Sequence, residues 1–496
     1  MKKRGLSLIL ALLIMMIINP SESLADNTIS NDIEKYVESM VRQADLPGVQ
    51  VTIVEDGEAP IFINKGYGNI DDKEPVTEET RFELGSNSKA FTGLGLMYLA
   101  EQGEISLDDP VKEYLPWFSL DYQGKEQELL VKDFLYQTTG VNPSTIGIIQ
   151  PDQSDDALKK VVEDLSEYEV VSNSGEEFLY ATINYDCIGL IIETVTGESY
   201  EQFINDTLLP YYGLNDTYAG KREEGEDSLA ATGYKFDLFG NSESEAPIYR
   251  GNTPAGYILT DGGDLAKWME LQLDAAMEKD DCDEIIMKSQ IPDDRVEPLL
   301  CEPYSDPFRY SAGWLVFDNG IVSHGGSNPD YSSYILIDGE NGHAVGVLCN
   351  RDTSYAYGIA KGIHDILLGN EPEKAPMDIF MTLVAITRIG LVIVSSLLIL
   401  AVFLLIKRMK KLKKRQLKLF ELMIKNKKRI IIPIVLIIIM IMLPVGLMCF
   451  SMYSISFLSV WAPICSIVLI AEIIILWIIG MINRIIKVVI PKGELK

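Results

Sequence analysis

Ser86-Asn87-Ser88-Lys89 is the stretch from which the whole chain is best interpreted. A glycine-punctuated, extended segment ending at Gly85 precedes it, and a helical run over 90–102, closed by Gly103, follows it. A serine and a lysine three positions apart in the first turn of a helix lie on one face. The helix N-terminus adds free N–H groups and positive potential, which disfavours a charged lysine. This predicts a serine nucleophile with a lysine as its proton partner; a capped helix with a solvated lysine is the alternative.

A second candidate segment is Phe178-Leu179-Tyr180-Ala181-Thr182-Ile183-Asn184-Tyr185, which leads into a helix ending at Thr196-Gly197. A tyrosine in a loop before a helix can point its phenol into a cleft. Beside a lysine, the pKa of Tyr180 is expected to fall, and the phenol then serves as general acid or base. The alternative is a core aromatic with a hydrogen-bonded hydroxyl.

The third candidate segment is His324-Gly325-Gly326-Ser327-Asn328, which follows a short strand. Glycines here let a substrate backbone approach the strand edge, and the histidine can hydrogen-bond the site or a substrate carboxylate. A turn with a satisfied histidine is the alternative. His343 and His364 are expected to be structural, without partners at ligand spacing. No metal or nucleotide motif is visible, so no metal and no cofactor are expected.

Strand patterns open and close the outer part of the chain, and helix patterns fill its middle. A helix over 31–45 and a hairpin over 49–63, turning at Asp56-Gly57, come first. Further strands are predicted over 313–317, 321–324, 331–338 and 344–350. The expected fold is α+β (an α/β sandwich), with one antiparallel sheet built from both chain ends, helices on its faces and a helical lobe beside it.

Taken in order, Ser-x-x-Lys, Tyr and His-x-Gly resemble the class C β-lactamase and penicillin-binding DD-peptidase family of serine hydrolases. The similarity extends over roughly residues 30–368 and includes Gly103-Glu104-Ile105-Ser106-Leu107-Asp108-Asp109-Pro110-Val111, Tyr114-Leu115-Pro116, Phe134-Leu135-Tyr136-Gln137-Thr138-Thr139-Gly140 and Ile191-Ile192-Glu193-Thr194-Val195-Thr196-Gly197.

The resemblance implies a role for each candidate residue. Ser86 would be the acylated nucleophile, Lys89 its activating partner and Tyr180 the proton shuttle. His324 and Gly326 would form the strand edge, and the N–H groups of Ser86 and Ser327 the oxyanion hole.

One residue departs from the family pattern. The family usually has Tyr-x-Asn, whereas this chain has Thr182 in place of the asparagine. A single hydroxyl cannot bridge Lys89 and a substrate amide as a carboxamide does, so substrate choice is expected to shift. Asn184 is not expected to substitute directly. Asn328 is a candidate for reading a substrate carboxamide.

The two ends of the chain carry membrane signals. Residues 1–25 form a predicted signal peptide, with a basic start at Lys2-Lys3-Arg4, an apolar core over 6–18 and small residues at 23–25. An uncleaved anchor is the alternative. Three apolar runs, 379–406, 430–450 and 457–482, are each long enough to span a bilayer, which gives three transmembrane helices over 379–482.

Charge sets the orientation. The loop 407–429 and the tail 483–496 are basic, so the positive-inside rule places both in the cytoplasm. The domain over 26–370, joined by a linker over 371–378, then lies outside. From residue 377 onward there are 17 Lys and Arg against 4 Asp and Glu; residues 1–376 hold 26 against 68, a net charge near −42. So acidic a domain argues against nucleic-acid partners.

Several single residues are left open by the sequence. Cys282 and Cys301 flank a Pro-containing insertion and are either bridged or free, whereas Cys187 is expected to be a buried thiol. Arg388 and Glu472 are costly inside lipid and either face one another or are accommodated by snorkelling and protonation.

The layout resembles the membrane-bound prodrug-activating peptidases of the colibactin-activating type. The expected function is a serine peptidase or amidase, acting through an acyl-enzyme on D-configured amides at the extracytoplasmic side of a bacterial inner membrane. The expected substrates are a small peptide, a D-amino-acid amide or a cell-wall peptide. A DD-peptidase, a β-lactamase and an esterase are rivals within the enzyme class, and a slow penicillin-recognising sensor or scaffold is the rival outside it.

Overall fold

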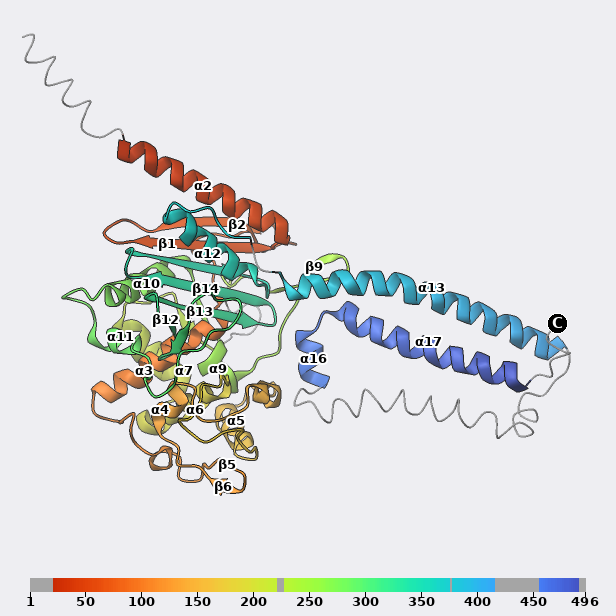
Figure 1. Cartoon of the computed structure of the whole chain (residues 1–496), viewed down its shortest axis with the longest axis horizontal. Helices are drawn as coiled ribbons and strands as arrows, with labels where there is room; N and C mark the ends of the chain where they lie inside the picture. Colours follow the sequence, from red (N-terminus) through yellow and green to blue (C-terminus); the bar gives the residue numbers. More distant parts are fainter. Residues whose placement is uncertain (1–20, 221–226, 375–376, 415–454, 490–496) are drawn as a thin grey trace, which may run out of the picture.

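The computed structural model describes residues 21–220, 227–374, 377–414 and 455–489. Within these ranges a mixed body of helices and strands is followed by helices that extend away from it (Figure 1). The main sheet consists of β1 (Gly48–Glu55), β2 (Ile61–Asn69), β3 (Glu74–Pro75), β11 (Phe308–Tyr310), β12 (Leu315–Phe317), β13 (Ile321–Asn328), β14 (Tyr331–Asp338) and β15 (His343–Cys349).

The order of these strands is β11-β12-β13-β14-β15-β1-β2-β3, and the pairs are antiparallel. The N-terminal hairpin therefore pairs with the C-terminal strands through β1 and β15, where Val51 lies opposite Val347. The prediction of one antiparallel sheet built from both chain ends is confirmed. The predicted hairpin turn also forms, with Gly57 at a φ of 77° that favours glycine.

Apolar side chains fill both faces of the sheet. On one face, α2 (Ser21–Ala44) and α12 (Tyr355–Leu367) cover β1, β14 and β15, with Val37, Val49 and Ile359 in this core (Figure 1). On the other face lie α3 (Ser88–Glu101) and α10 (Gly262–Ala276), with Phe91 stacked on Trp268 at 4.2 Å. Because β1 is covered on both sides, Val49, Val51 and Ile53 fill one apolar core, and Gln50 and Thr52 are buried on the opposite face.

The helical lobe beside the sheet is formed by the middle of the chain. Its α-helices are α4 (Val131–Leu135), α5 (Ala157–Leu165), α6 (Ile183–Thr196), α7 (Tyr200–Phe203), α8 (Leu209–Tyr211), α9 (Thr253–Gly256) and α11 (Glu284–Ser289). Single 3₁₀ or π turns are η1 (Gly85–Asn87), η2 (Val111–Glu113), η3 (Pro143–Ile148), η4 (Ile204–Leu208) and η5 (Arg250–Asn252). Short strands pair as β4 (Phe82–Glu83), β10 (Ile258–Thr260) and β7 (Tyr218–Ala219), as β5 (Asp121–Tyr122) with β6 (Lys125–Glu126), and as β8 (Tyr234–Asp237) with β9 (Gly240–Glu243).

Two helices after the sheet are long and apolar enough to cross a membrane: α13 (Ile379–Lys414) and α17 (Ile464–Val489). They run side by side away from the body (Figure 1). A short helix, α16 (Ile455–Trp461), precedes α17. The predicted span over 430–450 and residues 1–20 of the predicted signal peptide lie outside the described residues.

Several predicted boundaries are wrong. The apolar run 457–482 is divided into α16 and α17 by Ala462-Pro463, because proline lacks the N–H and disfavours helical backbone in the residue before it. The helix α13 continues to Lys414, inside the predicted basic loop, since lysine and arginine are good helix formers. The N-terminal helix predicted over 31–45 is longer than expected: its described part, α2, already includes residues 21–30, so it overlaps the predicted signal peptide.

The structure also shows the environment of each residue whose role the sequence left undecided. Cys282 and Cys301 lie in separate loops and are free thiols, and Cys187 is a buried thiol as predicted. Arg388 and Glu472 do not pair. The Arg388 guanidinium donates to the Asp237 carbonyl at 2.7 Å, and the Glu472 carboxylate accepts from the Ser395 hydroxyl at 2.8 and 2.9 Å.

Candidate active site

The turn η1 and the start of α3 place Ser86 and Lys89 together. The Lys89 ammonium or amine nitrogen Nζ lies 3.1 Å from Ser86 Oγ, as the three-residue spacing predicts. The two residues between them attach the turn to the fold. Asn87 donates to the Ser333 hydroxyl at 2.7 Å on β14, and Ser88 Oγ accepts from the Ile258 amide at 3.0 Å on β10. The nucleophile candidate is thus held by the main sheet and by a second, small sheet.

Strand β13 packs directly on the turn that carries Ser86. A Cβ on Gly326 would meet the Leu84 carbonyl oxygen at 1.9 Å, and one on Gly85, whose φ is +53°, would meet the Ser327 amide nitrogen at 2.6 Å. These two glycines are therefore required for the close approach. The His-x-Gly segment is not a turn: β13 extends to Asn328, and its amide at Ser327 lies beside the Ser86 turn.

Lys89 is fully buried and has three oxygen neighbours. Besides Ser86 Oγ, they are the Ala255 carbonyl at 2.8 Å and Thr182 Oγ1 at 3.5 Å. Burial lowers the pKa of Lys89 to about 7, with the carboxylate of Asp186 acting in the opposite direction. An uncharged amine has two hydrogens, for Ala255 and Thr182, and one lone pair, which is then free to accept the Ser86 hydroxyl proton.

Tyr180 lies against the same lysine. Lys89 Nζ is 5.3 Å from the centre of the Tyr180 ring, and the buried phenol oxygen makes no well-aligned hydrogen bond to the described residues, although the Ser86 side chain is near enough to interact with it. The expected fall in the pKa of Tyr180 is wrong: burial raises this pKa, against a smaller lowering by Ser86. At neutral pH Tyr180 is therefore a phenol that can donate a proton, and Lys89 is the stronger candidate for the base.

His324 packs beside Tyr180, with ring centres 5.8 Å apart. Its Nδ1 lies 2.7 Å from the Gly325 carbonyl, which only accepts, so the hydrogen is assigned to Nδ1, and Nε2 faces the Tyr310 hydroxyl at 3.4 Å. Burial, and then the charge of Lys89, lowers the pKa of His324 to about 3. Both ring nitrogens have protein partners, so the structure favours a packing role for His324 over the predicted contact with a substrate carboxylate.

The segment around Tyr180 is held by Gln137, part of the Phe134–Gly140 motif. The Gln137 side-chain oxygen accepts from the Ala181 amide at 3.0 Å and from the Asn184 side chain at 2.7 Å. Asn184 also accepts from Thr139 at 3.0 Å. Asn184 is thus occupied in the loop packing, which confirms that it does not replace the missing asparagine at 182.

Asp186 is a residue of the site that the sequence analysis missed. It lies on α6 four residues after Thr182, and therefore on the same helix face, and it is fully buried. Burial raises its pKa, against the opposing effect of Lys89. In the orientation that fits the Asp186 carboxylate, the side-chain nitrogen of Asn252 donates to its two oxygens at 2.9 and 3.1 Å. The sequence signal for Asp186 is an acidic residue inside the apolar run 183–192. The Ala255 carbonyl gives no signal in the sequence, because every residue type has a backbone carbonyl.

A small pocket, with a cavity volume of about 50 Å³, opens onto Ser86. Ser86, Thr182, Ser327 and Asn328 line it together with Ile146, Ile149, Tyr249, Asn252, Ala255, Gly256 and Tyr257. Phe457 and Trp461 of α16 complete the lining. The helix that precedes α17 therefore forms part of the pocket wall, a contact across more than two hundred residues of sequence.

Two polar residues in this wall are already engaged. Asn328 is buried and uses both amide hydrogens within the protein, on Glu83 at 2.6 Å and on the Gly256 carbonyl at 2.9 Å. Only its Oδ1 is left for the proposed contact with a substrate carboxamide. The Ser327 hydroxyl donates to Asp352 at 2.8 Å.

Comparisons with known proteins agree with this geometry. The family model described as Beta-lactamase matches residues 33–369. The chain is 30% identical to "Protein flp" of Staphylococcus aureus strain MW2 over 332 residues, which cover 66% of this chain and 64% of that protein. It is 26% identical to a protein named "Beta-lactamase" from Pseudomonas fluorescens, covering 68% of this chain and 97% of that one.

Among solved structures, the octameric penicillin-binding protein homologue from Pyrococcus abyssi superposes with a TM-score of 0.60 and 28% sequence identity, covering 70% of this chain and 79% of that one. The matched region spans just under two thirds of the length of the Staphylococcus relative. By the family model, the motif order and the fold together, this chain belongs to the beta-lactamase family, within the group of serine β-lactamases and penicillin-binding proteins.

Proposed function

We propose that the protein is a membrane-anchored serine hydrolase that works through an acyl-enzyme on Ser86. One observation carries the proposal: Lys89 Nζ lies 3.1 Å from Ser86 Oγ in a buried site that lowers the pKa of Lys89 to about 7. A buried lysine without this shift would be a permanent cation and could not accept the serine proton. Family membership supports the proposal but does not establish turnover for this chain.

The reaction follows from the positions of these groups. Neutral Lys89 takes the Ser86 proton as Oγ forms a bond to the substrate carbonyl carbon. The amides of Ser86 and Ser327 are proposed to hold the oxyanion, because the Ser327 amide lies against Gly85, the residue directly before Ser86. As the C–N bond breaks, the leaving amine takes a proton that passes from Lys89 by way of the Tyr180 phenol, and Lys89 returns to its neutral form. Water, activated by the same groups, then hydrolyses the ester and restores the Ser86 hydroxyl.

The proposed substrates are small peptides or amides with a D-configured residue, either prodrug-like or derived from the cell wall, that are met at the membrane surface. The lining of the pocket supports this location, because Phe457 and Trp461 belong to the helix next to the second candidate membrane span. An aromatic wall favours substrates that carry an apolar group next to the scissile amide.

The test uses the full-length chain in detergent, with a fluorescent penicillin, a fluorophosphonate and a series of acylated D- and L-amino-acid amides. We expect covalent labelling of Ser86, loss of labelling in Ser86→Ala, and faster cleavage of D- than of L-amides. Ser144→Ala is the control, because that hydroxyl already donates to Asn142 at 2.7 Å and should not be labelled. The serine-hydrolase proposal fails if the Ser86→Ala protein still hydrolyses these amides at the wild-type rate.

Thr182 favours a second candidate, a slow penicillin-recognising sensor. The Thr182 hydroxyl lies 3.5 Å from Lys89, at the outer limit of a hydrogen bond, where the family usually has an asparagine. A penicillin adduct that stays on Ser86 for hours, together with no cleavage of any amide, would favour the sensor. Rapid release of hydrolysed penicillin would instead favour a β-lactamase, and cleavage of esters alone an esterase.

A further inference from the structure

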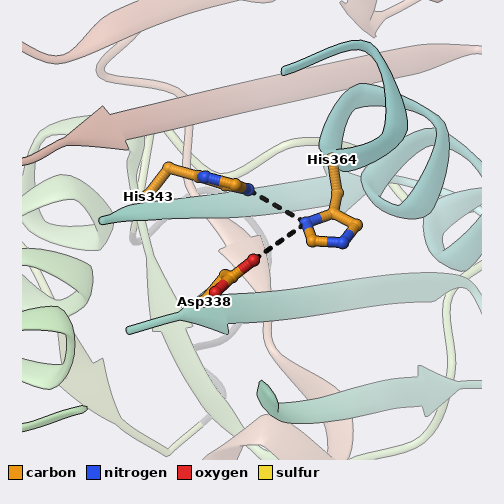
Figure 2. A group of neighbouring side chains, drawn as sticks. All are labelled: Asp338, His343 and His364. Carbon is orange, nitrogen blue, oxygen red and sulfur yellow. Dashed lines mark hydrogen bonds and ion pairs between the residues drawn. The ribbon is translucent and has the colours of Figure 1, made fainter. Parts of the chain in front are cut away.

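Three metal-binding side chains meet at the end of the main sheet that lies away from Ser86. Figure 2 shows Asp338 at the end of β14, His343 at the start of β15 and His364 on α12 pointing toward one another. Asp338 and His343 are cross-strand partners. Strand β13 pairs with β14 along its whole length, and Ile321 on β13 is the partner of Asp338. Gly326, which lies at the active site, is five residues further along the same strand. At ~3.3 Å per residue, the cluster is roughly 17 Å from the active site.

The expectation that these histidines lack partners at ligand spacing is wrong. His343 Nε2 lies 2.9 Å from His364 Nδ1, and His364 Nδ1 lies 3.7 Å from Asp338 Oδ2. One ligand atom from each of the three residues lies within 4.8 Å of the others. In the sequence the two histidines are 21 residues apart on different elements, so only the return of α12 along β15 brings them together.

These distances are close to those of a bound ion. A zinc ion holds imidazole nitrogens at ~2.0–2.1 Å in tetrahedral geometry, which places two such nitrogens about 3.3 Å apart. The separations from His364 Nδ1, 2.9 Å to His343 and 3.7 Å to Asp338, lie on either side of that value, and all three ligand atoms lie within 4.8 Å of one another. Two imidazoles and one carboxylate are also a common donor set for zinc.

The three side chains are buried and one of them is held by further hydrogen bonds, as metal ligands usually are, so they do not form a surface cluster. Asp338, His343 and His364 are 3%, 4% and 4% exposed. Asn341 holds the carboxylate from behind: its amide and its side chain donate to the two Asp338 oxygens at 3.0 and 2.8 Å. Such outer hydrogen bonds orient a metal ligand.

We propose that Asp338, His343 and His364 form a binding site for one divalent transition-metal ion of the zinc type. The ion ties α12 to the β14–β15 hairpin, and three protein ligands leave one tetrahedral position for a small ligand such as water. Its role is structural, since the cluster lies at the opposite end of the sheet from Ser86. The proposal does not depend on the proposed hydrolase activity.

The experiment uses the full-length chain in detergent, treated with a chelator and then titrated with Co²⁺ alone and with Zn²⁺ alone. We expect one equivalent of Co²⁺ to bind with the visible absorption of a tetrahedral nitrogen and oxygen site, and Zn²⁺ to displace it. Zn²⁺ should also raise the midpoint of thermal unfolding, because it binds the folded state.

Single-ligand variants test the assignment. In His343→Gln and His364→Gln the amide keeps a hydrogen-bonding group but is a poor ligand, so Co²⁺ affinity should fall at least about 100-fold. Asp365→Asn is the matched control, because Asp365 is a neighbouring buried acid that pairs with Lys361 instead, and it should bind Co²⁺ as the wild type does.

A cooperative thermal unfolding transition reports whether each variant is folded, without relying on the chemistry of Ser86. Absence of Co²⁺ and Zn²⁺ binding by the folded wild type would overturn the proposal and leave a hydrogen-bonded histidine pair. Equal binding by wild type and both glutamine variants would overturn it too. If the His→Gln variants do not fold, the wild-type titration still decides.

Discussion

Two buried polar clusters lie at opposite ends of the same sheet, and they differ in what each leaves unpaired. Around Ser86, the Tyr180 hydroxyl makes no well-aligned hydrogen bond to the described residues, and a small pocket opens onto the serine. Around His364, the facing nitrogens and the carboxylate point at one another, and all three residues are at most 4% exposed. Burial alone therefore does not mark a reactive site. Burial combined with an opening and an unsatisfied proton donor does.

The largest effect is expected from a substitution that disrupts only the Ser86 cluster. Lys89→Met removes the base but keeps the buried volume, so the rate of Ser86 acylation should fall by about 10²–10⁴-fold. Thermal unfolding should be unchanged or shifted upward, because a desolvated amine is removed. Stopped-flow labelling with a fluorescent penicillin measures the rate. His364→Gln serves as the comparison from the other cluster and should acylate like the wild type; a similar loss in both variants would mean that the two ends of the sheet are not independent.

The next effect tests the close approach of β13 to the Ser86 turn. Gly326→Ala places a Cβ at 1.9 Å from the Leu84 carbonyl, so the strand must move by more than an ångström. A displacement of about 1 Å costs about 10²-fold in rate. Gly325→Ala is the matched neighbour, since its Cβ meets only the Tyr334 ring, at 3.3 Å. Steady-state kinetics on a cleavable amide would separate the two, and equal rates for both variants would contradict the proposed oxyanion hole.

A smaller effect concerns the pocket wall supplied by α16. Trp461→Ala should lower kcat/KM about 10–150-fold for amides with an apolar acyl group and little for short polar ones, because an aromatic contact of about 1.5–3 kcal/mol is lost only in the first case. Trp117→Ala, on an exposed tryptophan outside the pocket lining, is the control. Equal losses on both substrate types would show that α16 does not contact the substrate.

The smallest expected effect tests whether Thr182 contributes to substrate selection. Thr182→Asn restores the residue usual in the family and should change the ratio of D-amide to penicillin acylation by about 2–10-fold, the value of one hydrogen bond. The two acylation rates, measured on the same preparation, give this ratio. No change in it would mean that the hydroxyl at 182 does not select substrates.

Much of this arrangement is predictable from the chain. The spacing of Ser86 and Lys89 fixes their contact because helix geometry alone brings i and i+3 together, and alternating apolar residues such as Val49, Val51 and Ile53 predict the central strand. The order of motifs predicts the family, which the family model shows, and it singles out Tyr180, which the structure places beside Lys89.

What could not be predicted depends on tertiary approach. The seating of Gly326 on Leu84, the Ala255 carbonyl at Lys89 and the meeting of His343 with His364 are set by how distant elements pack, not by any local pattern. The prediction for the pKa of Tyr180 has the wrong direction because desolvation by burial is the largest effect on this phenol, and the neighbouring Lys89 is only partly charged at neutral pH. The placement of α16 in the pocket wall depends on Pro463, whose effect on the apolar run 457–482 was overlooked.

The central claim is that Lys89 is the neutral base for Ser86, and the pH dependence of acylation tests it most directly. The rate of adduct formation on Ser86 can be followed by intact mass spectrometry from about pH 5 to about pH 9, a range on both sides of the expected pKa. Burial lowers the pKa of Lys89 to about 7, so the uncharged form accumulates as pH rises. The account predicts a rate that rises with pH, has its midpoint near pH 7 and then levels off, and a loss of this rise in Lys89→Met. A rate independent of pH across the range, or the same profile in both proteins, would contradict it.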